Sequence, residues 1–257
     1  GKELAGYHER KSSFVADVRS CEVLPPAVSR LIVPLREMFT TMALRERLPQ
    51  VELAVGEAVT VLVLRHLEPV GEEDRAKLRT FADRHGIQWW FQPKGPETAH
   101  PFYPEVAPAL DYRLPEFGLS IGFRPTEFTQ VNAAVNRVLV KRAVDLLDPR
   151  PGERVGDLFC GLGNFTLPIA TRAARVLGVE GSSALVARAQ ANFERNQPLV
   201  RVDKSPAAID FVVRNLFDMD AAQLLQDGNA DRWLVDPPRD GAFALVKALA
   251  AIHQARL

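Results

Sequence analysis

In the first third of the chain, apolar residues recur first with the period of a helix and then with that of strands. Within residues 25–47, large apolar side chains lie three or four positions apart, which predicts an amphipathic helix. Alternating and continuous apolar runs at residues 51–55 and 58–64 predict the two strands of a β-hairpin. The other elements predicted here are a helix over residues 71–85 and a strand over residues 87–91.

Seven prolines fall between residues 92 and 125, where no hydrophobic period is sustained. Such a stretch is typical of an irregular connector between two folded units. We therefore expect a smaller N-terminal α/β (α+β) domain over residues 1–115 and a second domain over residues 116–257.

Strand and helix patterns alternate through the second domain. It begins with a predicted helix over residues 132–147, whose apolar face carries Val135, Leu139, Ala143, Leu146 and Leu147. The predicted strands that follow are residues 154–159, 175–180, 209–214 and 232–236, and the predicted helices are residues 164–173, 183–195, 221–225 and 242–252. This alternation is typical of βαβ units around a mostly parallel sheet, in which ligands bind beyond the carboxyl ends of the strands. Gly156 interrupts the first strand for no reason that the sequence shows.

The composition is that of an ordinary globular protein and changes this picture little. The 257 residues are 47% hydrophobic and 25% charged, and equal numbers of basic and acidic residues give a formal net charge of zero. A nucleic-acid ligand would therefore have to be bound by local basic groups. Apolar runs are far shorter than the roughly 20 residues of a membrane span, and the first residues lack a signal-peptide pattern, so we expect a cytoplasmic protein.

The end of the first strand of the second domain is the strongest candidate for a ligand site. It runs into Phe159-Cys-Gly-Leu-Gly-Asn164, where two glycines let backbone amides approach a ligand and the next helix offers its N-terminus to an anion. The following strand ends at Glu180, from which a carboxylate can accept hydrogen bonds from both hydroxyls of a ribose. This pairing favours a nucleotide-like ligand over a merely structural glycine turn. Thr166 stands where a dinucleotide fingerprint has a third small residue, which disfavours an oxidoreductase.

The last two strands of the series also end in polar residues. Asn215 follows the third strand, where its amide can contact an adenine edge or cap a helix, and the sequence leaves both interpretations open. The fourth strand runs into Asp236-Pro-Pro-Arg-Asp-Gly241, in which two prolines hold the carboxylate in one direction.

Taken together, these motifs resemble the RNA uracil-C5 methyltransferase family. The resemblance covers nearly the whole chain and rests on Phe128-Thr-Gln-Val-Asn132, Asp157-Leu-Phe-Cys-Gly-Leu-Gly-Asn-Phe165, Gly178-Val-Glu180 and Asp236-Pro-Pro-Arg-Asp-Gly241. It implies a Rossmann-like α/β domain that binds S-adenosylmethionine, and the transfer of a methyl group to carbon 5 of a uracil in RNA. By the same resemblance, the residues that line the cofactor pocket are Gln130, Phe159, Asn164, Glu180, Asn215 and Asp236.

The resemblance also implies catalytic groups that this chain does not contain. In the family, a cysteine in a Ser-Cys-Asn-Pro motif adds to the uracil and a glutamate near the C-terminus removes a proton, and both would lie beyond Leu257. We therefore expect the chain to be part of a longer protein and, by itself, to be inactive and aggregation-prone. Cys160 lies within the cofactor loop, and the resemblance gives it no catalytic role.

A further motif, Asp17-Val-Arg-Ser-Cys21, resembles the branch of the family that acts on 23S ribosomal RNA. In that branch a cysteine at this position is the last of four ligands of a [4Fe-4S] cluster, so Cys21 is a candidate metal ligand whose three partners are absent here. The alternative is an ordinary half-buried thiol. The partner implied is RNA, in particular 23S rRNA. Neither a membrane nor an obligate protein partner is expected.

Rival interpretations keep the same cofactor but change the substrate. They are the methylation of another nucleobase, of tRNA or of a small molecule. A separate, non-enzymatic interpretation is a module that binds cofactor or RNA without catalysis. Candidate local contacts to RNA are Arg10, Lys11, Arg124 and Arg239, each of which is equally compatible with a solvated surface charge.

Overall fold

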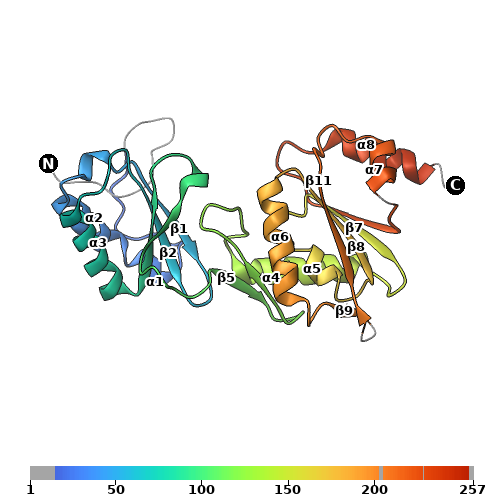
Figure 1. Cartoon of the computed structure of the whole chain (residues 1–257), viewed down its shortest axis with the longest axis horizontal. Coiled ribbons are helices and arrows are strands. Elements are labelled where there is room, and N and C mark those ends of the chain that lie inside the picture. Colours follow the sequence, from blue (N-terminus) through green and yellow to red (C-terminus); the bar gives the residue numbers. More distant parts are fainter. Residues whose placement is uncertain (1–14, 203–204, 228, 255–257) are drawn as a thin grey trace. The chain divides into compact units, whose positions relative to one another are not determined.

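The computed structural model describes residues 15–202, 205–227 and 229–254 (Figure 1). The chain divides into two compact units, Gly1–Leu110 and Asp111–Leu257. This division falls just before the boundary expected between residues 115 and 116, and residues 111–114 pair as a strand with residues 119–122 of the second unit. The expected division into two domains stays a prediction. None of the described helices is long and apolar enough to cross a membrane.

The first unit is built on a four-stranded sheet. Its strands are β1 (Gln50–Val55), β2 (Thr60–Arg65), β3 (Ile87–Gln92) and β4 (His100–Tyr103), in the order β1-β2-β3-β4. Its helices are α1 (Pro26–Ser29), α2 (Ile32–Thr41) and α3 (Glu72–His85), with the 3-10 turns η1 (Arg45–Arg47) and η2 (Pro96–Thr98). The predicted hairpin of β1 and β2 is confirmed, and α3 is the crossover that makes β3 parallel to β2.

The single helix predicted over residues 25–47 is wrong in its extent. Helix α1 ends at Ser29 and α2 begins at Ile32. Pro34 has no backbone N–H to donate to the carbonyl of Arg30, and proline is tolerated only in the first turn of a helix. The proline therefore fixes the start of α2, so the apolar period runs through two short helices rather than one long helix.

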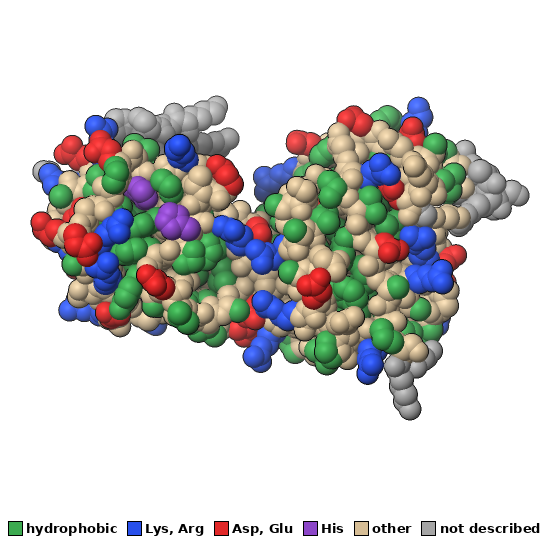
Figure 2. Space-filling model, in the orientation of Figure 1, with side chains coloured by type: hydrophobic (Ala, Val, Ile, Leu, Met, Phe, Trp, Pro, Cys, Tyr) green, Lys and Arg blue, Asp and Glu red, His purple; other side chains and the backbone are tan. Residues whose placement is uncertain are grey.

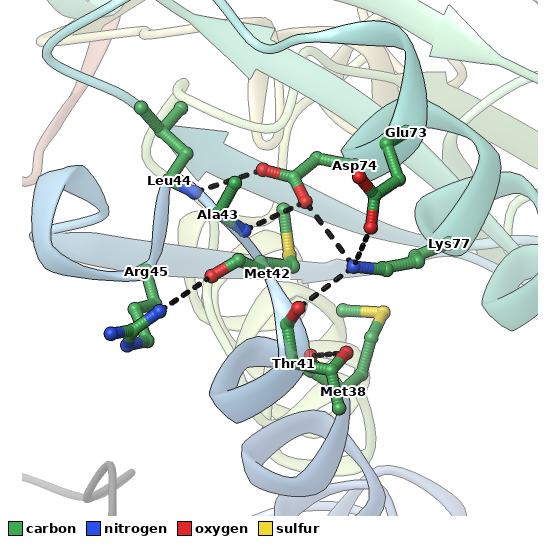
Figure 3. A network of polar contacts seen from close by, with 9 residues as sticks. All are labelled: Met38, Thr41, Met42, Ala43, Leu44, Arg45, Glu73, Asp74 and Lys77. Atoms are coloured by element: carbon green, nitrogen blue, oxygen red, sulfur yellow. Dashed lines mark hydrogen bonds and ion pairs between the residues drawn. The ribbon is translucent and has the colours of Figure 1, made fainter. Parts of the chain in front are cut away.

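A buried carboxylate joins α2 to α3 in the first unit (Figure 3). Asp74, in the first turn of α3, is buried and accepts hydrogen bonds from the backbone N–H groups of Ala43 (3.0 Å) and Leu44 (2.9 Å). Lys77, one turn further along α3, lies 3.7 Å from the same carboxylate and donates to the carbonyl oxygen of Thr41 at 2.7 Å. Because Thr41 ends α2, these bonds supply partners for backbone groups at the point where the helix stops.

The second unit contains a parallel four-stranded sheet with helices packed against it (Figure 1). Its strands are β7 (Arg154–Leu158), β8 (Arg175–Glu180), β11 (Ala208–Val213) and β12 (Arg232–Val235), in the order β11-β8-β7-β12. Its helices are α4 (Ala133–Leu147), α5 (Thr166–Ile169), α6 (Ser183–Asn196), α7 (Ala221–Asp227) and α8 (Phe243–Gln254). The predicted α/β fold with a parallel sheet is confirmed, although α5 is shorter than the helix expected over residues 164–173.

Two antiparallel hairpins accompany this sheet. One consists of β5 (Asp111–Leu114) and β6 (Leu119–Gly122), and the other of β9 (Arg201–Val202) and β10 (Ser205–Pro206). The proline-rich stretch is therefore not the irregular connector predicted from the sequence, because it contains β4, β5 and β6. Pro101 lies within β4 at the edge of the first sheet, where proline is tolerated. These strands span only four residues each, too few to establish an alternating pattern.

Helix α4 buries a different face from the one predicted. Asn136, Val140 and Val144 are buried, whereas Val135 is 59% exposed and Leu146 is 75% exposed. The helix carries apolar residues on both sides, so its period alone does not identify the buried face. The predicted face, which includes Leu139, is largely open to solvent.

Gly156 has a clear packing role on β7. The residue opposite it on β12 is Trp233, and a Cβ at Gly156 would lie 2.2 Å from the indole ring. Any side chain larger than hydrogen would therefore displace the ring. The glycine that weakens the strand locally makes room for an aromatic residue of the neighbouring strand.

Candidate functional site

The loop after β7 turns sharply and is attached to the neighbouring strand. Phe159, Gly161 and Gly163 have φ angles of 67°, 55° and 91°, in the left-handed region that glycine adopts most easily. The N–H groups of Phe159 and Cys160 both donate to the carbonyl oxygen of Val179, at 2.9 and 3.1 Å. The loop therefore folds against the end of β8, and Phe159 is held in a conformation that is uncommon for a residue with a side chain.

Glu180 is bonded to this glycine loop. Its Oε2 accepts the N–H of Gly161 at 3.1 Å, and its Oε1 accepts the N–H of Ser182 at 3.0 Å. Each carboxylate oxygen has two lone pairs, so each can accept a further hydrogen bond. The carboxylate is thus oriented by two backbone amides and still able to accept from two hydroxyl groups.

Asp157, the last but one residue of β7, lies beneath the loop and is fully buried. Its Oδ2 accepts the hydroxyl of Thr166 at 2.6 Å, while its Oδ1 has no partner among the described residues. Burial raises the pKa of this carboxyl to about 7, and the nearby charges of Asp236 and Glu180 add to the effect. Thr166, which sets the loop apart from a dinucleotide fingerprint, is therefore bonded back to the strand.

Cys160 is buried within the same loop. Burial, reinforced by the charge of Asp157, raises the pKa of its thiol far above the usual range. A nucleophilic cysteine needs its thiolate form, which requires a lowered pKa and access to a substrate. Cys160 has neither property, so it serves packing rather than covalent catalysis.

Asn215 closes a turn after β11. Its Nδ2 donates to Asp218 at 2.6 Å, and its Oδ1 accepts the N–H of Phe217 at 3.1 Å. Helix α7 starts further along, where Asp220 accepts the N–H of Gln223 at 2.8 Å, so the alternative interpretation of Asn215 as a helix cap is wrong. The turn brings the Phe217 ring to 5.6 Å from the ring of Phe159 in an edge-to-face arrangement.

Asp236 follows β12 and is exposed. Its N–H donates to the carbonyl oxygen of Leu158 at 3.4 Å, which continues the pairing of β12 with β7 by one residue. The two prolines lead into a turn in which the N–H of Gly241 donates to Pro238 at 2.9 Å, with Gly241 at a φ of 77°. The exposed carboxylate therefore lies at the same edge of the sheet as the glycine loop.

Comparison with known proteins identifies the family. The family model described as tRNA (uracil-5-)-methyltransferase matches residues 114–254, more than half of the chain. The chain belongs to this family.

Relatives within the family extend the match over the first unit. The chain is 58% identical over 256 residues to the 23S rRNA (uracil(1939)-C(5))-methyltransferase RlmD of Acidovorax sp. (strain JS42), covering 100% of this chain and 53% of that relative. The RlmD protein of Albidiferax ferrireducens is 60% identical over 258 residues, with 100% of this chain and 54% of that relative covered. The chain spans about half the length of the curated relatives that it matches.

A solved structure shares the fold. The crystal structure of Pyrococcus abyssi tRNA (uracil-54, C5)-methyltransferase, determined with S-adenosyl-L-homocysteine, superimposes with a TM-score of 0.66 at 20% identity and covers 93% of this chain and 58% of that chain. The Rossmann-like methyltransferase fold expected from the sequence is thus confirmed.

Five of the six residues expected to line the cofactor pocket lie at the carboxyl ends of the parallel strands or in the loops that follow them. They are Phe159, Asn164, Glu180, Asn215 and Asp236. The sixth, Gln130, is exposed on the segment between β6 and α4, and no described contact joins it to the other five. Their binding of cofactor stays a prediction.

Sequence reasoning missed the groups that hold these residues in place. Asp157 belongs to the motif that carries the family resemblance, but no sequence pattern indicates its burial beneath the loop. Tyr112 and Asn136, which bond to Asn164, come from β5 and α4, and neither position carries a local motif. A polar residue at a helix position flanked by apolar neighbours was the only available signal for Asn136.

Cys21 lies in the first unit, in a turn that precedes α1. Its N–H donates to Ser29 Oγ at 2.8 Å, and the side chain is half-buried. Within the described residues, no group of three or more histidine, cysteine or acidic side chains is arranged to hold a metal ion. The chain has two cysteines and the other, Cys160, is buried in the second unit, so its residues do not fit a [4Fe-4S] cluster.

Proposed function

We propose that the protein containing this chain transfers a methyl group from S-adenosylmethionine to carbon 5 of a uracil in 23S rRNA. The observation that carries the proposal is the Glu180 carboxylate, bonded to the N–H of Gly161 in the glycine loop. The choice of 23S rRNA rests on the RlmD relatives, whose similarity extends over the whole chain. Action in the cytoplasm, as expected from the sequence, is part of the proposal.

The side chains at the sheet edge fit a nucleoside ligand. Glu180 retains two acceptor positions for the ribose hydroxyls. The rings of Phe159 and Phe217 offer an apolar surface for a base, and Asn215 lies beside them. Asn164, Asp236 and Gln130 complete the proposed pocket. S-adenosylmethionine, when bound there, supplies an activated methyl group.

The chain itself supplies binding and orientation rather than the nucleophile. Attack on carbon 6 of uracil needs a thiolate, and Cys160 is buried with a raised pKa. We therefore propose that the 257-residue chain does not turn over by itself. A role for Cys21 as a cluster ligand would depend on thiolates from outside this chain.

RNA would be bound by local basic groups rather than by a general positive field. Figure 2 shows Lys and Arg side chains lying among Asp and Glu side chains on the face it displays, in keeping with the zero net charge. Among the candidate contacts, Arg239 is exposed three residues after Asp236, and Arg124 is half-buried near the start of the segment that carries Gln130. Arg10 and Lys11 lie outside the described residues.

The proposal is tested by methyl transfer from radiolabelled S-adenosylmethionine, catalysed by the complete product of the gene that encodes this chain. A 23S rRNA fragment should be methylated at carbon 5 of one uracil, and the Glu180→Gln variant should bind S-adenosylhomocysteine at least about 10-fold more weakly in calorimetry. The substitution removes the charge and places an amide N–H against a backbone N–H. Glu194→Gln, at an exposed glutamate of α6, is the matched control and should bind as the wild type does.

Transfer to tRNA is the second candidate, because the family model and the Pyrococcus abyssi enzyme both carry that substrate in their names. Methylation of tRNA with no incorporation into the 23S fragment would replace the ribosomal substrate by this one. Unchanged cofactor affinity in Glu180→Gln, or binding of a nicotinamide dinucleotide instead, would remove the basis of the proposal. Multiple turnover by the 257-residue chain alone would contradict the role given to it.

A further inference from the structure

The side-chain amide of Asn164, in the glycine loop, is held by two residues from other elements. Its Oδ1 accepts the hydroxyl of Tyr112 at 2.7 Å and the amide Nδ2 of Asn136 at 3.1 Å. Its Nδ2 donates to Asn136 Oδ1 at 3.0 Å, so the two asparagines form a reciprocal pair. Three hydrogen bonds therefore fix both the position and the orientation of this amide.

These contacts determine what Asn164 can still do. Both lone pairs of its Oδ1 are used, whereas its Nδ2 has two hydrogens and uses one of them within the described residues. Burial raises the pKa of the Tyr112 hydroxyl, so that group remains a donor throughout the physiological range. Asn164 is thus preset as a single N–H donor, suited to an oxygen acceptor on a ligand.

Tyr112 itself stands on a hairpin that is anchored to the same loop. Asn192 of α6 accepts the N–H of Gly122 at 2.8 Å and donates to the carbonyl oxygens of Gly122 at 2.9 Å and of Leu162 at 3.0 Å. Because Leu162 belongs to the glycine loop, one buried amide joins the loop, α6 and the hairpin of β5 and β6.

A second asparagine one turn along α6 repeats this attachment. Asn196 accepts the N–H of Ser120 at 3.0 Å and donates to its carbonyl oxygen at 2.7 Å. The two asparagines bind the edge of β6 in the way that a neighbouring strand would. The hairpin is therefore a fixed support from which Tyr112 reaches the loop.

We propose that Tyr112 and Asn136 are positioning residues for the cofactor, which act through Asn164 by holding its amide N–H toward the ligand. The inference rests on the proposed function, because it takes the glycine loop as the binding site for S-adenosylmethionine. Neither residue touches the ligand in this account. A donor that is already oriented binds more tightly than one that must be ordered on binding, since the ordering cost has been met in the fold.

A double-mutant cycle on the complete gene product separates positioning from general support. Tyr112→Phe keeps the ring and removes only the hydroxyl, so it should raise the Kd for S-adenosylhomocysteine and the KM for S-adenosylmethionine by about 3- to 10-fold, as expected for one hydrogen bond. The value of kcat should stay within about twofold of the wild type. In an Asn164→Ala background, the same Tyr112→Phe change should alter the Kd by less than about twofold, because its target is gone.

Tyr103→Phe is the matched control, since it also removes one tyrosine hydroxyl, which donates to Asp83 at 2.9 Å in the first unit. It should leave the Kd unchanged. An equal loss of affinity from Tyr112→Phe with and without Asn164 would show a merely structural role and overturn the inference, as would an unaltered Kd in the single variant. Thermal unfolding of each variant identifies any that fail to fold. If Tyr112→Phe is one of them, Asn136→Ala replaces it in the same double-mutant cycle with Asn164→Ala. Failure of the wild type to bind either cofactor form would instead refute the proposed function.

Discussion

At the scale of single residues, Asp157 is the most unusual group in the second unit. It is fully buried, one of its oxygens has no partner among the described residues, and its pKa is raised to about 7. Between its ordinary value of 3.8 and this raised value, the folded protein binds a proton that the unfolded chain has lost. The contribution of Asp157 to the free energy of unfolding is therefore complete below about pH 4 and is lost as the pH rises through about 7.

We predict that Asp157→Asn flattens this part of the stability profile. In urea unfolding between pH 4 and 8, the free energy of unfolding of the wild type should fall by on the order of 3 kcal/mol relative to that of the variant. Thr166→Val removes the hydroxyl that stabilises the charged form of Asp157. In this variant the free energy of unfolding should continue to fall up to a higher pH. A variant profile as steep as that of the wild type would mean that other groups produce the slope.

At the scale of elements, the buried carboxylate of Asp74 sets how the chain leaves α2. It accepts two backbone N–H groups, and an asparagine amide cannot accept at both positions. Asp74→Asn should therefore lower the free energy of unfolding of the first unit by about 1–3 kcal/mol in urea titrations. Glu73→Gln removes an exposed carboxylate that is bonded to Lys77, the lysine that also lies beside Asp74. This substitution should change the free energy of unfolding by less than about 0.5 kcal/mol. Equal effects of the two substitutions would contradict this account.

The elements also show which parts of the fold the sequence could predict. Strands β7 and β8 and helix α6 follow from local periods, and their ends fix the positions of Phe159 and Glu180. The hairpin of β5 and β6 could not be predicted, because its short strands are held by Asn192 and Asn196, far away in sequence. The prediction of the buried face of α4 failed for a related reason. Asn136 is buried because Asn164 offers it a hydrogen-bond partner, and no local sequence pattern encodes that pairing.

At the scale of the whole molecule, the second unit exposes several large apolar side chains. On α4, three apolar side chains are each more than half exposed: Val135, Val138 and Leu146. Among the described strands of the parallel sheet, β12 is an edge strand. Such surfaces associate in water. We predict that the 257-residue chain forms concentration-dependent oligomers in light scattering, and that Val138→Glu combined with Leu146→Glu weakens the association at least about 10-fold.

The control for this prediction is Leu67→Glu, at an apolar residue of the first unit with 56% exposure. It should leave the oligomers as they are, since a single exposed leucine outside a patch is ordinary. A chain that stays monomeric at high concentration, or one for which all three substitutions act alike, would show that the α4 surface is not the site of association.

The packing of Trp233 against Gly156 gives the second unit its own optical signal. The protein has three tryptophans, and the other two, Trp89 and Trp90, lie together on β3 of the first unit. Trp89 is fully buried, whereas Trp90 and Trp233 are both half-exposed, so an aqueous quencher reaches one indole in each unit. Because the Trp233 ring lies against the strand that leads into the glycine loop, its emission reports on the sheet beside that loop. In a variant that lacks Trp89 and Trp90, one natural fluorophore would therefore report on the second unit alone.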